Sequence, residues 1–184
     1  MDIIETKLPG VLILQPKIFT DDRGLFFECF QAEKYVQHGI DLPFVQDNFS
    51  RSYKSVLRGM HYQFPNTQGK LIWVTRGHVF DVVVDIRRDS PTFGNFCSIN
   101  LSPEKIQQVY IPPGFAHGFC TLTDEVDFHY KCTDYFYPQQ DRGFCWNDPD
   151  VSIPWPIKNP TLSPKDTTYP RLKDISPENL PVYE

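Results

Sequence analysis

Short apolar runs alternate with turn residues along most of the chain, a pattern typical of β-strands. In the run from His78 to Ile86, Phe80, Val82, Val84 and Ile86 share one face, whereas Asp81 and Asp85 fall on the opposite face. Only residues 31–38 favour a helix, and it is short. The runs that predict strands are residues 11–14, 25–30, 70–74, 78–86, 96–101, 109–111 and 126–132. Many short strands at this spacing predict an all-β fold, an antiparallel sandwich or jelly roll.

The C-terminal part of the chain differs in composition from the rest. Residues 149–184 contain 8 of the 17 prolines. Proline removes a backbone donor and interrupts regular structure, so we expect irregular chain that wraps the β-structure. A length of 184 residues favours a single domain, 1–184, rather than two.

The net charge and the cysteine content argue against several classes of function. The formal net charge of -5 argues against nucleic-acid binding, which requires a basic face. The five cysteines are scattered without the close spacing of zinc or redox motifs, so we expect free thiols in a reducing compartment. The N-terminus lacks a basic segment followed by a long apolar run, and no stretch approaches the length of a membrane span. We therefore expect a cytoplasmic, soluble protein.

Two histidines lie in distinctive surroundings. His61 ends the run LRGMH at residues 57–61, and His117 follows the turn PPG at residues 112–114. A run near the C-terminus, LSPKD at 162–166, adds a cation and the carboxylate of Asp166. A base, a cation and a carboxylate are the groups needed to remove a proton from carbon beside a carbonyl. Structural alternatives remain open, since either histidine could be a packed core residue and Asp166 could cap a turn.

Other chemistries find less support in the sequence. There is no phosphate-binding or dinucleotide-binding glycine loop and no Gly-x-Ser-x-Gly elbow. A histidine on one strand and Pro-x-Gly-x-x-His on a later one is similar to the metal-binding cupin pattern, but Gln63 occupies the position of that pattern's second histidine. His61 and His117 alone are too few ligands for a tight transition-metal site, so we expect no metal and no cofactor. Tyr130 lies in a tyrosine-rich segment where packing explains most aromatic residues.

Taken together, these runs resemble the dTDP-4-dehydrorhamnose 3,5-epimerase family, which has a cupin fold. The resemblance extends from about Leu8 to about Tyr169 and Pro170, nearly the whole chain. The matching runs are FTDDRG (19–24), FVQDNFS (44–50), VLRGMHYQ (56–63), QGKL (68–71), VDIR (84–87), SPTFG (90–94), IPPGFAHGF (111–119), WNDP (146–149) and LSPKD (162–166).

The resemblance implies epimerisation of dTDP-4-dehydro-6-deoxy-D-glucose at C3 and C5 through an enolate. It implies His61 as the general base, Asp166 as its partner, Tyr130 as the general acid and Lys70 as the residue that stabilises the enolate. It also implies a homodimer in which the N-terminal strands complete the partner's pocket. The residues that the resemblance assigns to substrate binding are Arg23, Glu28, Gln46, Asp47, Asn48, Arg58, Lys70, His117, Phe136, Asp141 and Lys165.

Two positions depart from the family pattern. Phe136 stands where a tyrosine that stacks on the thymine ring is common, and Asp141 stands where glutamate is common. Phenylalanine retains the stacking face and loses the hydroxyl. The alternatives are a 3- or 5-epimerase that inverts one centre, a metal-dependent cupin dioxygenase or isomerase, and a sugar-binding cupin without activity.

Overall fold

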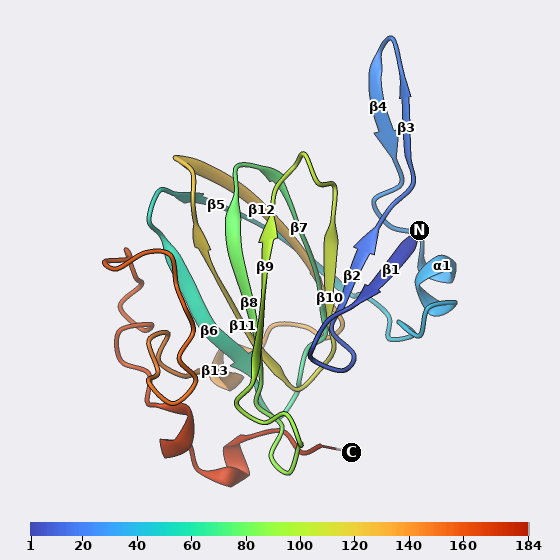
Figure 1. Cartoon of the computed structure of the whole chain (residues 1–184). Helices are drawn as coiled ribbons and strands as arrows, with labels where there is room; N and C mark the ends of the chain where they lie inside the picture. The colour runs from blue at the N-terminus through green and yellow to red at the C-terminus, as the bar shows by residue number, and fades with distance from the viewer. Residues whose placement is uncertain (184) are drawn as a thin grey trace.

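Two antiparallel β-sheets face each other in the computed structural model, which describes residues 1–183 (Figure 1). The six-stranded sheet has the order β1 (Asp2–Glu5), β2 (Leu12–Gln15), β10 (Gln108–Ile111), β7 (Lys70–Arg76), β12 (Glu125–Cys132) and β5 (Gln46–Tyr53). The five-stranded sheet has the order β13 (Asp141–Gly143), β6 (Leu57–Gln63), β11 (Phe115–Thr121), β8 (Val79–Asp85) and β9 (Phe96–Leu101). The predicted all-β sandwich is therefore confirmed.

Most predicted strands correspond to observed ones within a few residues. The predicted strand 25–30 ends earlier, because β4 is Gly24–Phe27, and the predicted helix 31–38 shortens to α1, Ala32–Val36. The side chain of Gln31 accepts a hydrogen bond from the Lys34 backbone and so caps the start of α1. Strands β1, β3 (Ile18–Asp21), β5, β6, β11 and β13 did not appear among the predicted runs.

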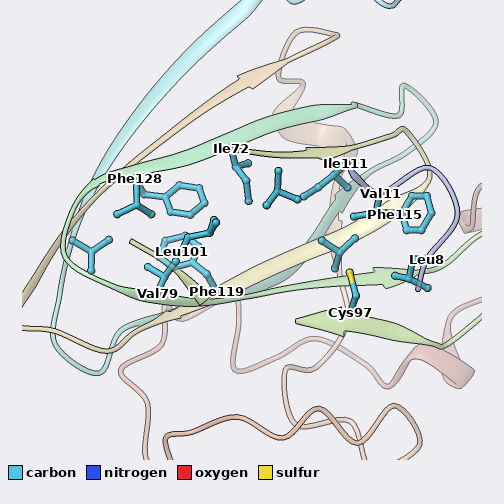
Figure 2. Close-up of a cluster of buried hydrophobic side chains, with 14 residues drawn as sticks. Leu8, Val11, Ile72, Val79, Cys97, Leu101, Ile111, Phe115, Phe119 and Phe128 are labelled. Atoms are coloured by element: carbon cyan, nitrogen blue, oxygen red, sulfur yellow. The ribbon is translucent and has the colours of Figure 1, made fainter. Parts of the chain in front are cut away.

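The space between the two sheets is filled at one end by apolar side chains (Figure 2). Phe119 of β11 and Phe128 of β12 stack across it with ring centroids 4.2 Å apart and planes 5° from parallel. Ile72 and Ile111 from the six-stranded sheet meet Val79 and other residues from the five-stranded sheet. Burial of this apolar surface holds the sheets together at this end.

The outer face of the five-stranded sheet is covered by the proline-rich segment. Here the apolar positions of β8 that include Val82 and Val84 pack against Val151, Leu172 and Leu180. This segment contains the 3-10 helices η2 (Leu172–Asp174) and η3 (Pro177–Asn179) and otherwise irregular chain; a third, η1 (Pro138–Gln140), precedes β13. Both faces of β8 are thus buried, so Asp81 and Asp85 face the interior rather than solvent.

A hairpin formed by β3 and β4 projects away from the sandwich (Figure 1). It exposes large apolar side chains, with Phe26 68% and Leu25 57% exposed. Arg23 lies at its turn. No helix within residues 1–183 is long and apolar enough to cross a membrane.

Candidate active site

The open end of the sandwich contains a cavity of about 520 Å³. Its walls come from both sheets and from the C-terminal segment. The stacked pair Phe119 and Phe128 contributes to its lining. The expected site residues in its lining are Gln46, Asn48, Arg58, His61, Lys70, His117, Tyr130, Phe136, Asp141, Lys165 and Asp166.

His61 and Asp166 form a direct pair in this cavity. Nε2 of His61 lies 2.5 Å from Oδ1 of Asp166, although the two residues are 105 positions apart in the chain. The His61 side chain is 25% exposed, whereas that of Asp166 is 1% exposed. Asp166 therefore bonds the histidine rather than capping the turn beside it, where the hydroxyls of Thr167 and Thr168 bond backbone carbonyls instead.

Backbone pairing with the segment before β6 brings Asp166 to His61. Thr161 donates its backbone N–H to Ser55 and accepts from Leu57 at the start of β6, at 2.7 and 3.1 Å. A tight turn follows, in which the Asp166 backbone N–H lies 3.1 Å from the Ser163 carbonyl oxygen. This anchor fixes the C-terminal segment against the strand that holds His61.

Burial, hydrogen bonds and neighbouring charges lower the pKa values of both His61 and Asp166. Burial lowers the pKa of His61 below 6.5, although Asp166 opposes the shift, and the charges of Lys165 and Lys70 lower it further. Burial would raise the pKa of the Asp166 carboxyl, but hydrogen bonds from His61 and Ser163 hold it below its usual value. At neutral pH the arrangement is a neutral imidazole beside a carboxylate, which is a competent proton acceptor.

Tyr130 and Lys70 lie on the opposite wall. They belong to β12 and β7 of the six-stranded sheet, whereas His61 belongs to β6 of the five-stranded sheet. Burial raises the pKa of the Tyr130 phenol, so the phenol retains its proton at neutral pH. Burial lowers the pKa of the Lys70 ammonium, and nearby negative groups oppose that shift.

A second histidine–aspartate pair includes His117, which also lines the cavity. His117 of β11 is directly opposite His61 of β6 in the strand register. The Nε2 atom of His117 lies 2.7 Å from Oδ2 of Asp81, which belongs to β8. Sequence reasoning did not select Asp81, although its position in an alternating strand was a signal.

Gly59 lets strands β6 and β11 approach each other closely. Its backbone φ is +123°, and a Cβ there would lie 2.6 Å from the Cα of Gly118. A side chain at this position would therefore force the two strands apart. The register between these strands shifts between His117 and Phe119.

The other polar residues at the cavity form local pairs. Gln46 Nε2 donates to Asn48 Oδ1 at 2.9 Å, and Arg58 Nε donates to Ser52 Oγ at 3.0 Å. Lys165 forms an ion pair with Asp141 at the cavity wall. The Phe136 ring is half exposed, and the Phe136 backbone N–H donates to Gln46 Oε1 at 2.8 Å.

Three expected binding residues do not line this cavity. Arg23 and Glu28 belong to the projecting hairpin and its exit, where they pair with Asp21 and Lys34. Asp47 pairs with Lys131 on the outer face of the sheet. Strand alternation explains this position, since Gln46 and Asn48 point inward and the residue between them must point outward.

The side-chain amide of Gln63 bonds the backbone of neighbouring loops through both its nitrogen and its oxygen. Its Nε2 donates to the carbonyls of Asn66 and Tyr135 at 2.6 and 3.1 Å, and its Oε1 accepts from the Tyr137 backbone at 2.8 Å. Among residues 1–183, no three His, Cys, Asp or Glu side chains gather as a metal-holding group.

Comparison with known proteins identifies the family. A family model described as dTDP-4-dehydrorhamnose 3,5-epimerase matches residues 5–174. The chain belongs to this epimerase family. The dTDP-4-dehydrorhamnose 3,5-epimerase of Shigella flexneri is 49% identical over 176 residues, covering 95% of this chain and 97% of that relative. The resemblance drawn from sequence motifs is confirmed.

Solved structures of the epimerase family share the whole fold. The dTDP-6-deoxy-D-glucose-3,5-epimerase RmlC from Legionella pneumophila Philadelphia 1, in complex with dTDP-4-keto-L-rhamnose, superposes with a TM-score of 0.97. It is 50% identical, and the match covers 100% of this chain and 98% of that one. ChmJ, a 3'-monoepimerase from Streptomyces bikiniensis in complex with dTDP-quinovose, has a TM-score of 0.91 at 35% identity, covering 97% and 92%. The fold alone therefore does not distinguish single from double inversion.

Proposed function

We propose that the protein inverts C3 and C5 of dTDP-4-dehydro-6-deoxy-D-glucose to give dTDP-4-dehydro-L-rhamnose. The observation that carries this proposal is the pairing of His61 with Asp166 on one wall of a cavity whose opposite wall holds Tyr130 and Lys70. Membership of the epimerase family supports the same activity.

The reaction begins with proton removal by His61. A ketone at C4 acidifies the hydrogens on both C3 and C5, so one base can serve both centres. With Nε2–H donated to Asp166, the other ring nitrogen holds the lone pair that accepts the proton. The electrons of the broken C–H bond move onto the C4 oxygen to form an enolate.

Lys70 stabilises that enolate. An ammonium group in a partly buried site interacts strongly with developing negative charge, because little water screens it. Lys70 lies on the strand next to Tyr130, at the wall facing His61.

Tyr130 returns a proton to the face opposite the base. Inversion requires a separate acid on that face, and the two sheets supply base and acid from opposite sides. The raised pKa of Tyr130 keeps the phenol protonated until the enolate forms. Solvent then takes the proton from His61 and reprotonates Tyr130, so each turnover exchanges substrate hydrogen with water.

The nucleotide and sugar bind through the remaining cavity residues. Arg58 and Lys165 supply positive charge for the diphosphate, and His117 contacts the sugar. The half-exposed ring of Phe136 provides a stacking face for the base. Gln46, Asn48 and Asp141 complete the polar lining.

A deuterium experiment tests this function. The protein is incubated with dTDP-4-keto-6-deoxyglucose in deuterated water, and deuterium at C3 and C5 is counted by NMR. We expect deuterium at both carbons and the doubly inverted sugar. Exchange at one carbon alone would identify a single-centre epimerase, and exchange at neither would refute the proposal.

We also propose a homodimer in which the β3–β4 hairpin enters the partner's cavity. The hairpin projects from the sandwich (Figure 1) and exposes apolar residues that include Phe19, Leu25 and Phe26. A contiguous exposed apolar surface is typical of an interaction site. This arrangement would bring Arg23 and Glu28 to the substrate, although neither lines the cavity of its own chain.

Subunit complementation tests the dimer. Arg23→Ala and His61→Ala proteins are each expected to be nearly inactive, the first through its hairpin and the second through its cavity. Unfolded and refolded together, they form mixed dimers in which one cavity has both intact parts. We expect mixing at equal amounts to restore about a quarter of wild-type activity. No recovery from a demonstrated mixed dimer would show that Arg23 serves its own chain.

We further propose that the enzyme works in the cytoplasm. All five cysteines are free, including the exposed Cys29. Free thiols persist in a reducing compartment, which supports this location.

A further inference from the structure

The aromatic ring of Tyr169 lies against His61, the proposed base. The centroids of the two rings are 5.9 Å apart, and their planes meet at 71°, which is an edge-to-face arrangement. Tyr169 is half-buried and does not line the cavity, whereas His61 does. The imidazole therefore borders the cavity and is also packed against a ring that lies outside it.

The strand next to His61 leaves room for this ring. Gly143 of β13 is directly opposite His61 of β6 in the strand register. A Cβ on Gly143 would lie 2.5 Å from Cε2 and 2.6 Å from Cζ of Tyr169, and 2.6 Å from the carbonyl oxygen of Met60. Non-bonded atoms do not approach so closely, so a side chain at this position would displace the Tyr169 ring or strand β6. The ring thus occupies space that glycine leaves open beside the base.

Backbone hydrogen bonds hold both ends of the stretch of chain that contains Tyr169. One anchor is the pairing of Thr161 with the segment at the start of β6. The other lies just beyond β13, where the backbone N–H of Cys145 donates to the carbonyl oxygen of Pro170 at 2.8 Å. Asp166 and Tyr169 lie between these two anchors, and both contact the imidazole.

The two contacts constrain the imidazole in different ways. Asp166 bonds a single ring atom, and that bond tolerates a tilt of the ring because hydrogen bonds accept a range of angles. A ring packed edge-to-face resists the same tilt, since it would bring carbon atoms too close together. Burial raises the pKa of the Tyr169 phenol, so this ring is uncharged at neutral pH and acts through its shape.

We propose that Tyr169 is a positioning residue of the reaction, whose ring holds the imidazole of His61 in the orientation that directs its free nitrogen at the substrate. This inference rests on the proposed epimerase function. A base must lie within hydrogen-bond reach of the proton that it removes, and a displacement of about 1 Å can lower the rate by as much as ~10²-fold. Because one base serves C3 and C5, the orientation of its ring affects both centres.

The Tyr169 ring also shields His61 from water. Burial is the main cause that lowers the pKa of His61. The titratable groups around His61 are Asp166 and Lys165 of the C-terminal segment, Lys70 of β7 and His117 of β11. Removal of the uncharged ring leaves these groups in place and admits water, so the pKa of His61 should rise toward 6.5.

Steady-state kinetics at about pH 8, where His61 is neutral in every variant, test the orientation of the base. In Tyr169→Ala we expect kcat to fall about tenfold with an unchanged KM, because the ring contacts the base and does not line the cavity. Tyr169→Phe should retain the kcat of the wild type, since it keeps the ring. The matched control is Tyr183→Ala, which removes an exposed ring of the C-terminal segment that lies near Arg87 and should change neither constant.

An NMR titration provides the second measurement and requires no turnover. The ring C–H signals of His61 are assigned by their loss in His61→Ala and followed as the pH is varied. In Tyr169→Ala we expect the pKa of His61 to rise. A loosened segment that withdrew Asp166 would lower this pKa instead, because Asp166 raises it. The two signs separate loss of the ring contact from a general loosening of the segment.

Three results would overturn the inference. They are an unchanged kcat in Tyr169→Ala, a His61 pKa that stays constant or falls in that variant, and a loss of rate in Tyr169→Phe as large as in Tyr169→Ala. If Tyr169→Ala does not fold, Tyr169→Leu retains apolar bulk without a flat ring, and a reduced kcat with an unchanged KM is then the deciding result. If the wild type exchanges no deuterium, the proposed function fails on its own, and the titration still shows whether Tyr169 covers His61.

Discussion

Both histidines that line the cavity pair with an aspartate, and the two pairs have similar bond lengths and different surroundings. His61 and Asp166 lie 2.5 Å apart, and His117 and Asp81 lie 2.7 Å apart. The His61 side chain is 25% exposed and its partner comes from the C-terminal segment, whereas the His117 side chain is 10% exposed and its partner lies on the adjacent strand. The first pair can exchange a proton with substrate and solvent, while the second is better suited to hold the orientation of the His117 ring.

The difference shows that the same two residue types serve different purposes according to their access to water. A general base must lose and regain a proton in each turnover, which requires an exposed nitrogen. A buried pair relaxes less and fixes its neighbours more firmly. We therefore expect replacements in the two pairs to affect different kinetic constants.

The largest effect is expected from the histidines. His61→Ala should abolish deuterium exchange at both C3 and C5, because the base begins both events, and removal of a general base commonly costs ~10²–10⁴-fold. His117→Ala should mainly raise KM, because we propose that this ring contacts the bound sugar. Deuterium exchange at both carbons measures the first effect, and steady-state kinetics measure the second. His78→Ala serves as a control, because it breaks only an exposed ion pair with Glu104. Near wild-type exchange by His61→Ala would place the base elsewhere.

A second prediction separates the base from the acid. Tyr130→Phe retains the ring and removes the phenol, so exchange at C3 should largely persist while inversion at C5 falls ~10²-fold or more. NMR of the products should show a 3-epimer or returned substrate. Tyr110→Phe removes a phenol buried outside the cavity and should leave the product unchanged. Undiminished formation of the doubly inverted sugar by Tyr130→Phe would reduce Tyr130 to a packing residue.

The alternation of apolar and polar residues predicted some strands well and missed others for a physical reason. Strand β8 was found because its apolar positions alternate with Asp81 and Asp85. Strand β5 was missed because its inward positions, which include Gln46, Asn48 and Ser50, are polar. These residues face a cavity rather than an apolar core, so the usual signal of a half-buried strand is absent.

The candidate site could be predicted only in part for a similar reason. Its histidines stood out through their local runs, and the resemblance supplied their partners. Periodicity cannot reveal a contact such as that between His61 and Asp166, 105 positions apart, because it depends on how the C-terminal segment is anchored at Thr161. Asp81 was missed because its partner is set by the register of β8 against β11.

A third prediction concerns the carboxylate of the exposed pair. Asp166→Asn removes a charge that raises the pKa of His61, so that pKa should fall further. A weaker base lowers the maximal rate, by about tenfold for a shift of one unit. The base acts in its neutral form, so activity lost on acidification should persist to lower pH than in the wild type. Asp150→Asn, which breaks an exposed ion pair on the same segment, should change neither the rate nor the profile. A profile shifted to higher pH would contradict this assignment.

The last prediction is that chelation of metal ions has no effect on activity. A metal-dependent cupin would require both histidines as ligands, yet the Nε2 atoms of His61 and His117 are each engaged by a carboxylate. Gln63, at the position of the missing cupin histidine, uses its amide to hold two loops. Exchange at both carbons should therefore continue at the same rate after exhaustive chelation. Loss of exchange with rescue by one divalent ion would mean that the two pairs act together as a metal site, and the distinction between a proton-transferring pair and an orienting pair would fail.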